Sequence, residues 1–234
     1  MPAEVIKTPL HPKRAEVMLR ELRGVSTGME ELSIALITLG PGYKFPFEKH
    51  PIATEIWLAH QGAGEVASMK DGDLIKEPVR AGDVVRVDPT TIHRLGAEDN
   101  SGLVVTAFSF PAWRKEGNQE VTLNESMYAP RKEQHCVLPV HAVHDAGEPI
   151  IVDQNGFQWK LGIKRIRRSG VITMNAREER LYYIVVTGNG RVMFDLTFES
   201  EVSPGNLIMP EVGQRVEFTT NSGLILAQLS LKEE

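Results

Sequence analysis

Short runs of apolar and β-branched residues recur along the whole chain, as in residues 32–39, 83–87 and 103–110. Turns rich in Gly, Pro, Asp and Asn separate these runs, for example at residues 98–102. Short strands joined by tight turns are typical of β-sandwiches and β-barrels. The pattern therefore predicts a mostly β protein. One stretch, residues 13–22, could form a short helix, although its periodicity is weak.

The second half of the chain repeats features of the first half in the same order. The four matched pairs are residues 32–42 with 161–170, 62–66 with 188–192, 82–89 with 205–210, and 103–108 with 224–229. Such a repeat indicates a duplicated unit, and its period is too long for a solenoid. We therefore expect an N-terminal domain over residues 1–115 and a C-terminal domain over residues 151–234. The polar segment 116–150 is expected to connect them and to carry a strand of its own.

Composition limits the classes of function that the chain can serve. The chain has 234 residues, 41% of them hydrophobic, which is enough for two small domains with separate cores. Its formal net charge is −5 and charges of both signs are interspersed, so the sequence predicts no nucleic-acid surface. No apolar run approaches the roughly 20 residues that cross a bilayer, and the N-terminus lacks the apolar core of a secretion signal. These features predict a cytoplasmic protein that acts on a small molecule.

The single cysteine, Cys136, excludes an intramolecular disulfide and any metal site built on paired thiolates. A metal ion in this protein must therefore bind to His, Asp and Glu side chains. Candidate ligands of these types occur in two segments of the first repeat.

Two segments of the first repeat carry a spaced set of such residues. The segment from Gly42 to Gly62 contains Glu48, His50 and Glu55, and the segment that begins at Gly82 ends at His93. These segments resemble the two motifs of the cupin family, with Glu48 at the place where the family has its first His. The resemblance implies two tandem jelly-roll β-barrels in an all-β chain, with one divalent metal ion in the N-terminal barrel and a possible homodimer.

Strand geometry by itself supports a site formed by these four residues. In an extended strand alternate side chains share a face, so Glu48 and His50 are expected to point the same way. The turn beyond Pro51 lets Glu55 approach from the next strand, and His93 arrives from a separate strand. Small barrels can hold one ligand in their mouths. We therefore predict a metal site formed by these four residues, whereas His60, with the opposite strand parity to Glu55, should point away from it.

Glu48 leaves two hypotheses open. If it is a ligand, two carboxylates and two neutral imidazoles balance a divalent cation, which favours Fe or Mn over Cu, with Zn, Ni and Co as further candidates. If it is not, His50, Glu55 and His93 form the two-His-one-carboxylate set of non-haem Fe(II) oxygenases. Glu48 would then be a catalytic general base beside the ion.

The second repeat has lost this set. Alignment on its glycines places Ala176, Glu178, Leu181 and Val216 at the ligand positions, and a single carboxylate cannot hold a metal. The resemblance therefore implies an active-type N-terminal barrel and a degenerate C-terminal barrel. Side chains that could line the first cavity or meet an anionic substrate are the following: Phe45, Phe47, Trp57, Arg86 and Arg94.

Three functions are compatible with this reading. The first is an Fe(II)-type dioxygenase on a small molecule, as in two-barrel cupin dioxygenases with one active barrel. The second is a non-redox isomerase, lyase or hydrolase that uses the metal on a sugar or carboxylate substrate. The third is a cupin that binds a small molecule without turnover.

Overall fold

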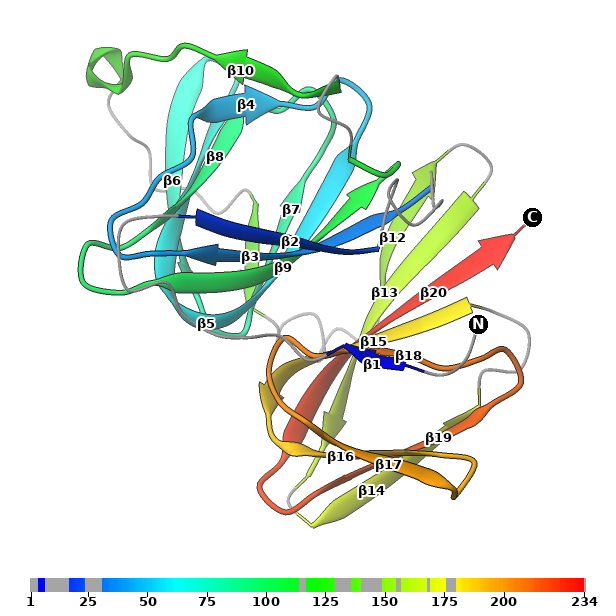
Figure 1. Cartoon of the computed structure of the whole chain (residues 1–234). Coiled ribbons are helices and arrows are strands. Elements are labelled where there is room, and N and C mark those ends of the chain that lie inside the picture. Colours follow the sequence, from blue (N-terminus) through cyan, green and yellow to red (C-terminus); the bar gives the residue numbers. More distant parts are fainter. Residues whose placement is uncertain are drawn as a thin grey trace. The chain divides into compact units, whose positions relative to one another are not determined.

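A computed structural model describes residues 4–6, 17–23, 31–113, 117–128, 136–139, 149–154, 157–167, 169–175 and 180–233 (Figure 1). The described chain is built almost entirely of strands, and its one labelled helical turn is the short 3₁₀ helix η3 (Glu125–Met127). The all-β prediction of two tandem jelly-roll barrels is confirmed. Among these residues no helix is long and apolar enough to span a membrane. The chain divides into two compact units, Leu10–Pro139 and Met1–Pro9 with Val140–Glu234.

The N-terminal unit is a barrel organised around one long strand, β5 (Thr54–Lys70), which pairs with β6, β7, β8 and β9. The path through the main sheet runs β10-β4-β8-β5-β9-β3-β2. The remaining strands have these bounds: β2 Val17–Arg23, β3 Ser33–Leu39, β4 Phe47–Lys49, β6 Asp73–Arg80, β7 Asp83–Val87, β8 His93–Ala97, β9 Leu103–Phe110, β10 Gln119–Val121 and β11 Val137–Pro139.

Strand β2 corrects the helix expected over residues 13–22. Residues 17–23 pair antiparallel along β3, while residues 13–16 lie outside the described part of the chain. The ladder with β3 outweighs a weak helical periodicity, because tertiary pairing routinely overrides local propensity.

A glycine inside β5 lies tightly against β9 and shows why the repeat carries glycines. Gly62 has φ of +83°, and a Cβ there would lie 1.7 Å from the carbonyl oxygen of Gly102. In the C-terminal unit Gly188 has φ of +86°, and its Cβ would lie 2.1 Å from the carbonyl oxygen of Gly223. Only glycine fits both the dihedral angle and the close backbone approach. The same constraint at matched positions supports the duplication inferred from the sequence.

The C-terminal unit is a second barrel of two sheets. One sheet has the order β1-β18-β15-β20-β13-β12 and the other has the order β14-β19-β16-β17. Its strands have these bounds: β1 Glu4–Ile6, β12 Ile150–Gln154, β13 Phe157–Ile166, β14 Gly170–Asn175, β15 Arg180–Gly188, β16 Gly190–Phe194, β17 Phe198–Val202, β18 Leu207–Met209, β19 Arg215–Thr220 and β20 Leu224–Glu233. The N-terminal strand β1 therefore belongs to this unit, where it pairs with β18.

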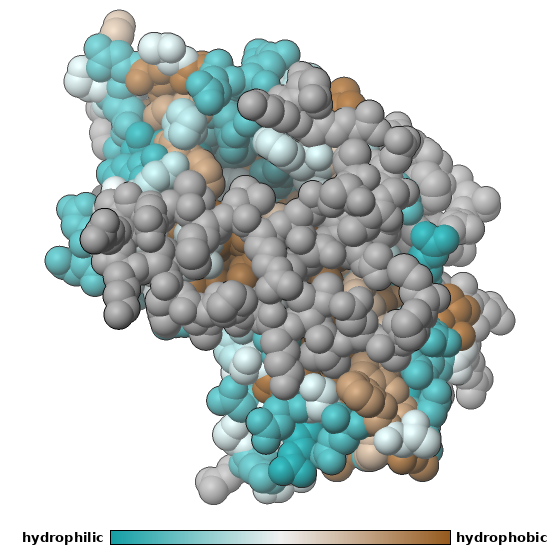
Figure 2. All heavy atoms as spheres, viewed as in Figure 1, coloured by the Kyte–Doolittle hydropathy of each residue, from teal (hydrophilic) through white to brown (hydrophobic). Residues whose placement is uncertain are grey.

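Each barrel has its own apolar interior. Trp57, Val85 and Val105 are among the buried residues of the first core, and Tyr183, Val192 and Phe218 are among those of the second. On the face drawn in Figure 2 hydrophilic residues make up much of the described surface, with smaller hydrophobic areas between them. This distribution agrees with sheets that place alternate side chains inside and outside.

Candidate metal centre

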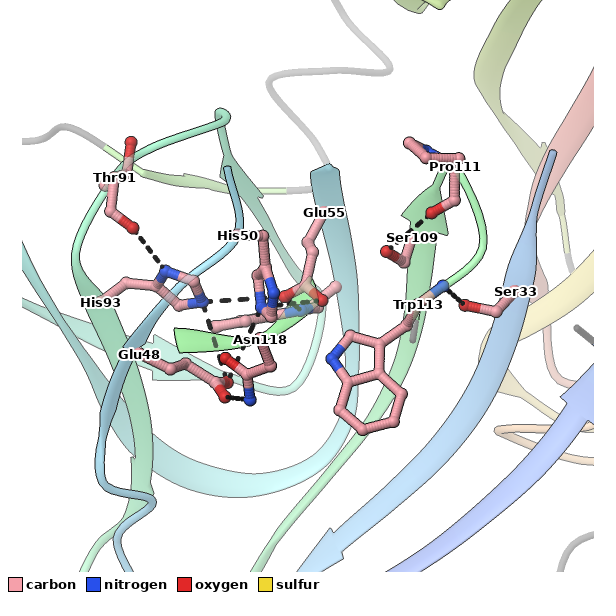
Figure 3. Close-up of polar contacts among 11 residues, drawn as sticks. Ser33, Glu48, His50, Glu55, Thr91, His93, Ser109, Pro111, Trp113 and Asn118 are labelled. Atoms are coloured by element: carbon pink, nitrogen blue, oxygen red, sulfur yellow. Dashed lines mark hydrogen bonds and ion pairs between the residues drawn. The ribbon is translucent and has the colours of Figure 1, made fainter. Parts of the chain in front are cut away.

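Strands β4, β5 and β8 bring the four predicted residues together at one place in the N-terminal barrel (Figure 3). Glu48 on β4 is the direct cross-strand partner of His93 on β8. His50 follows β4 on the same side as Glu48, and Glu55 lies near the start of β5. The strand β4 and the turn after it bring Glu48, His50 and Glu55 together, and the pairing of β8 with β4 adds His93.

The separations between the side-chain atoms suit a shared ion. His50 Nε2 lies 3.4 Å from Glu55 Oε1 and 3.9 Å from Glu48 Oε1. His93 Nε2 lies 3.7 Å from Glu55 Oε2 and 4.0 Å from Glu48 Oε1. Ligand atoms that each lie about 2.0–2.2 Å from one ion are about 3–3.6 Å apart, so small movements would complete the contacts.

Three of the four residues form a group in which all three ligand atoms lie close to one another. One ligand atom each from Glu48, His50 and His93 lie within 4.8 Å of one another. Glu55 is not in this group, although its two oxygens are the atoms nearest to the two imidazole nitrogens among the ion pairs given above.

One nitrogen of each imidazole, Nε2, lacks the hydrogen bond that a buried polar atom normally makes. Within the described part of the chain, His50 Nε2 and His93 Nε2 are both buried and have no hydrogen-bond partner. The other nitrogen of His93, Nδ1, lies 2.9 Å from the carbonyl oxygen of Thr91. Because a carbonyl can only accept, Nδ1 carries the proton and the Nε2 lone pair faces inward. Unpartnered nitrogens opposite carboxylate oxygens fit a divalent metal ion.

The charges of the site are strongly coupled through short distances and burial. Burial, together with the nearby Glu55 carboxylate, raises the pKa of Glu48. Burial opposes ionisation of Glu55 as well, but contacts with His93 and His50 and a hydrogen bond from Trp57 lower its pKa. Burial likewise opposes protonation of His93, yet its contact with Glu55 raises its pKa. A buried carboxylate, Glu55, beside a partly buried one, Glu48, favours a bound cation, which would neutralise them.

Trp57 is the predicted aromatic residue that contacts the site. Its indole Nε1 donates a hydrogen bond of 3.1 Å to Glu55 Oε2, and its ring centre lies 5.5 Å from that of His93. Phe47 is buried beneath the guanidinium of Arg94, whose carbon lies 4.7 Å from the ring centre. Phe45 is half-buried and packs against the main core of the barrel. Of these three aromatic residues, Trp57 is the one that contacts and orients a candidate ligand.

The two arginines proposed for an anionic substrate already pair with carboxylates. Arg94 binds Glu125 of η3 through both terminal nitrogens. Arg86 Nε donates a 2.8 Å hydrogen bond to Asp88. These contacts hold both guanidinium groups against carboxylates and not toward the imidazoles. The structure therefore does not support either arginine as a residue that binds the substrate.

His60 is separate from the site, as its strand parity predicted. Its side chain is buried and Nε2 lies 2.7 Å from the hydroxyl of Thr106 on β9. His60 thus has a structural partner, unlike Nε2 of His50 or His93.

Asn118 is a residue of the site that the sequence motifs did not indicate. Its amide Nδ2 donates a hydrogen bond to Glu48 Oε2 from a position 70 residues further along the chain. The contact arises because β10 pairs antiparallel with β4, with Glu120 opposite Glu48. No local pattern around Asn118 predicts this register.

The matched position in the second barrel is apolar. Val216 pairs with Phe194 there, as His93 pairs with Ser68 in the first barrel. Val216 and Leu181 are buried members of the second core. Ala176 and Glu178, the other two aligned positions, lie outside the described residues.

Comparisons with known proteins agree with this fold. Residues 35–109, which include all four candidate ligands, match the family described as "Cupin domain". No curated protein matches the chain significantly. A mutant of oxalate decarboxylase from Bacillus subtilis superposes with a TM-score of 0.58 at 11% identity, covering 92% of this chain and 72% of that chain.

The structure of the same Bacillus subtilis enzyme at pH 4.6 gives a TM-score of 0.56 at 12% identity, with the same coverage of 92% and 72%. Identities this low establish similarity of fold alone. Residues 35–109 thus match the cupin-domain family, and the chain has the fold of two tandem cupin barrels.

Proposed function

We propose that the N-terminal barrel binds one divalent metal ion and uses it in an enzymatic reaction on a small molecule. The observation that carries the proposal is the pair of buried, unpartnered nitrogens, His50 Nε2 and His93 Nε2, beside the oxygens of Glu48 and Glu55. Two imidazoles with two carboxylates favour Fe or Mn, while Zn, Ni and Co also accept such ligands.

The specific reaction that we propose is that of a non-haem Fe(II) dioxygenase. His50, His93 and Glu55 provide two imidazoles and one carboxylate, the set that holds iron with open positions in such enzymes. The bound ion would supply the redox and Lewis-acid chemistry. Thr91 and Trp57 keep the ligands His93 and Glu55 in orientation through their hydrogen bonds.

If His50, His93 and Glu55 alone hold the ion, Glu48 is the residue best placed to accept a proton from the substrate; if Glu48 also binds the ion, it is the fourth ligand. Its side chain is 21% exposed, against 5% for His50, 9% for Glu55 and 0% for His93. An incoming molecule can therefore reach Glu48 more easily than the other three residues. A carboxylate within hydrogen-bond reach of a substrate hydroxyl is a suitable general base.

The C-terminal barrel has a different role in this proposal. Buried Leu181 and Val216 at the ligand-equivalent positions support a barrel without metal. Its proposed task is packing or formation of a homodimer, and the expected homodimer can be checked by light scattering of the purified chain.

The test of the reaction is reconstitution of metal-free protein with Fe(II), Mn(II) or Zn(II), followed by assays on aromatic and diketone compounds in an oxygen electrode. Oxygen consumption by the Fe(II) form, and not by the Mn(II) or Zn(II) form, supports the dioxygenase. Turnover of a sugar or carboxylate substrate by the Mn(II) or Zn(II) form without oxygen would replace it with an isomerase, lyase or hydrolase. Ligand binding without any turnover would identify a non-catalytic cupin.

A further inference from the structure

Asn118 has two polar atoms at the metal centre, and only one of them has a partner. Nδ2 donates to Glu48 Oε2, whereas Oδ1 is buried and has no hydrogen-bond partner among the described residues. Figure 3 shows the Asn118 amide beside the Glu48 carboxylate, below the two imidazoles. Unsatisfied buried polar atoms are rare because their desolvation is not compensated. The Oδ1 atom thus joins the two Nε2 atoms as a third unmet polar group in one place.

The backbone that carries Asn118 is fixed at both ends of the segment 117–128. At one end β10 pairs with β4, with Gln119 opposite Lys49, so Asn118 lies next to the level of His50. At the other end Glu125 of η3 receives Arg94 and lies 2.7 Å from Lys76 Nζ. The amide is therefore held against the site by a strand ladder and by an ion-pair cluster.

The hydrogen bond from Asn118 gives the two carboxylate oxygens of Glu48 different contacts. Oε2 accepts the hydrogen bond from Asn118, and Oε1 is the oxygen that lies 3.9 Å from His50 Nε2 and 4.0 Å from His93 Nε2. Occupation of Oε2 prevents the carboxylate from turning both oxygens toward the imidazoles. Glu48 is thereby limited to one oxygen at the centre.

We propose that Asn118 is a positioning residue of the metal centre. Its Nδ2 keeps Glu48 in the one-oxygen orientation, and its Oδ1 accepts a hydrogen bond from the ligand that accompanies the ion. That ligand must be a hydrogen-bond donor, such as a water molecule or the hydroxyl group of a substrate. The inference rests on the proposed function in the form in which Glu48 is also a ligand, because it requires an ion between His50, His93 and both carboxylates.

The experiment is a Mn(II) titration of the full chain. Calorimetry measures the affinity, and EPR spectroscopy records the signal of the bound ion. Loss of a residue that orients a metal ligand typically weakens binding about 10–100-fold, and we expect Asn118→Ala to do so. It should also change the EPR line shape, because Glu48 is free to rotate. The loss of affinity in the double variant with Glu48→Gln should be smaller than the sum of the two single losses, since Asn118 acts in part through Glu48.

Two further variants separate positioning from folding. Asn118→Leu keeps nearly the same side-chain shape without polar atoms, and it replaces Asn118→Ala if the smaller residue prevents folding. Asn124→Ala removes the cap whose Oδ1 accepts from the backbone N–H of Ser126 in the same segment. This control should lower the midpoint of thermal unfolding of the protein. Its Mn(II) affinity and EPR line shape should stay those of the wild type.

The outcomes distinguish this inference from the proposed function. Wild-type affinity and line shape in Asn118→Ala or Asn118→Leu, or losses that add fully to that of Glu48→Gln, would overturn the inference alone. Equal loss in Asn124→Ala would also overturn it, because the effect would then belong to the segment. Absence of Mn(II) binding to the wild type, with Fe(II) and Zn(II) also not bound, would overturn both.

Discussion

Trp57→Phe tests whether a single hydrogen bond orients the Glu55 carboxylate for metal binding. The indole Nε1 lies 3.1 Å from Glu55 Oε2, and both side chains are buried. A hydrogen bond to a charged acceptor is worth about 1.5–3 kcal/mol, which corresponds to about 10–150-fold in an equilibrium constant if all of it is expressed in binding. Because His93 and His50 also hold Glu55, we expect the lower end, a roughly tenfold weaker Mn(II) affinity by calorimetric titration.

The matched control for this variant is Trp159→Phe. Trp159 is equally buried but lies on β13 of the C-terminal unit. It should lower the midpoint of thermal unfolding through lost packing and leave Mn(II) affinity unchanged. Wild-type affinity in Trp57→Phe, or an equal loss in Trp159→Phe, would refute the assignment of Trp57 as the residue that orients Glu55.

Two other predictions concern the barrel that carries the site. Burial raises the pKa of Cys136 from 9.0 to about 11, so the native thiol should react with a thiol reagent at pH 8 roughly a hundredfold more slowly than in urea, as followed by absorbance. The stability that comes from this raised pKa is fully present below pH 9 and is lost as the pH rises toward 11; a native rate equal to the unfolded rate would contradict the burial. Gly62→Ala should destabilise the protein by more than about 3 kcal/mol in urea unfolding, because its Cβ would meet a backbone carbonyl. Gly72→Ala, with φ of +87° and nothing within 4 Å, should cost only about 1 kcal/mol, and equal costs would refute the steric argument.

The candidate ligands could be predicted because they lie in local patterns. Glu48, His50 and Glu55 are separated by one strand and one turn, and the alternation of side chains in a strand fixes which of them share a face. His93 followed from its spacing after the turn at Gly82. The two barrels were likewise predictable from repeated glycine turns, whose backbone geometry leaves no choice of residue.

Long-range pairing explains what the sequence did not indicate. Asn118 reaches Glu48 only through the register of β10 on β4, and Arg94 is occupied because Glu125 arrives from η3. Strand β1 is three residues long, too short for a periodic signal, yet it pairs with β18. In each case the partner lies far away in the sequence, so the local composition carries no information about the contact.

The most direct test of the metal centre is elemental analysis of the purified chain beside two single-histidine variants. We expect close to one equivalent of a divalent metal in the wild type and in His60→Ala, whose histidine bonds to Thr106 outside the site. His93→Ala, which removes a buried nitrogen of the centre, should hold almost none. A wild type that neither contains metal nor takes it up, or a His93→Ala variant that keeps its metal, would contradict the proposed centre.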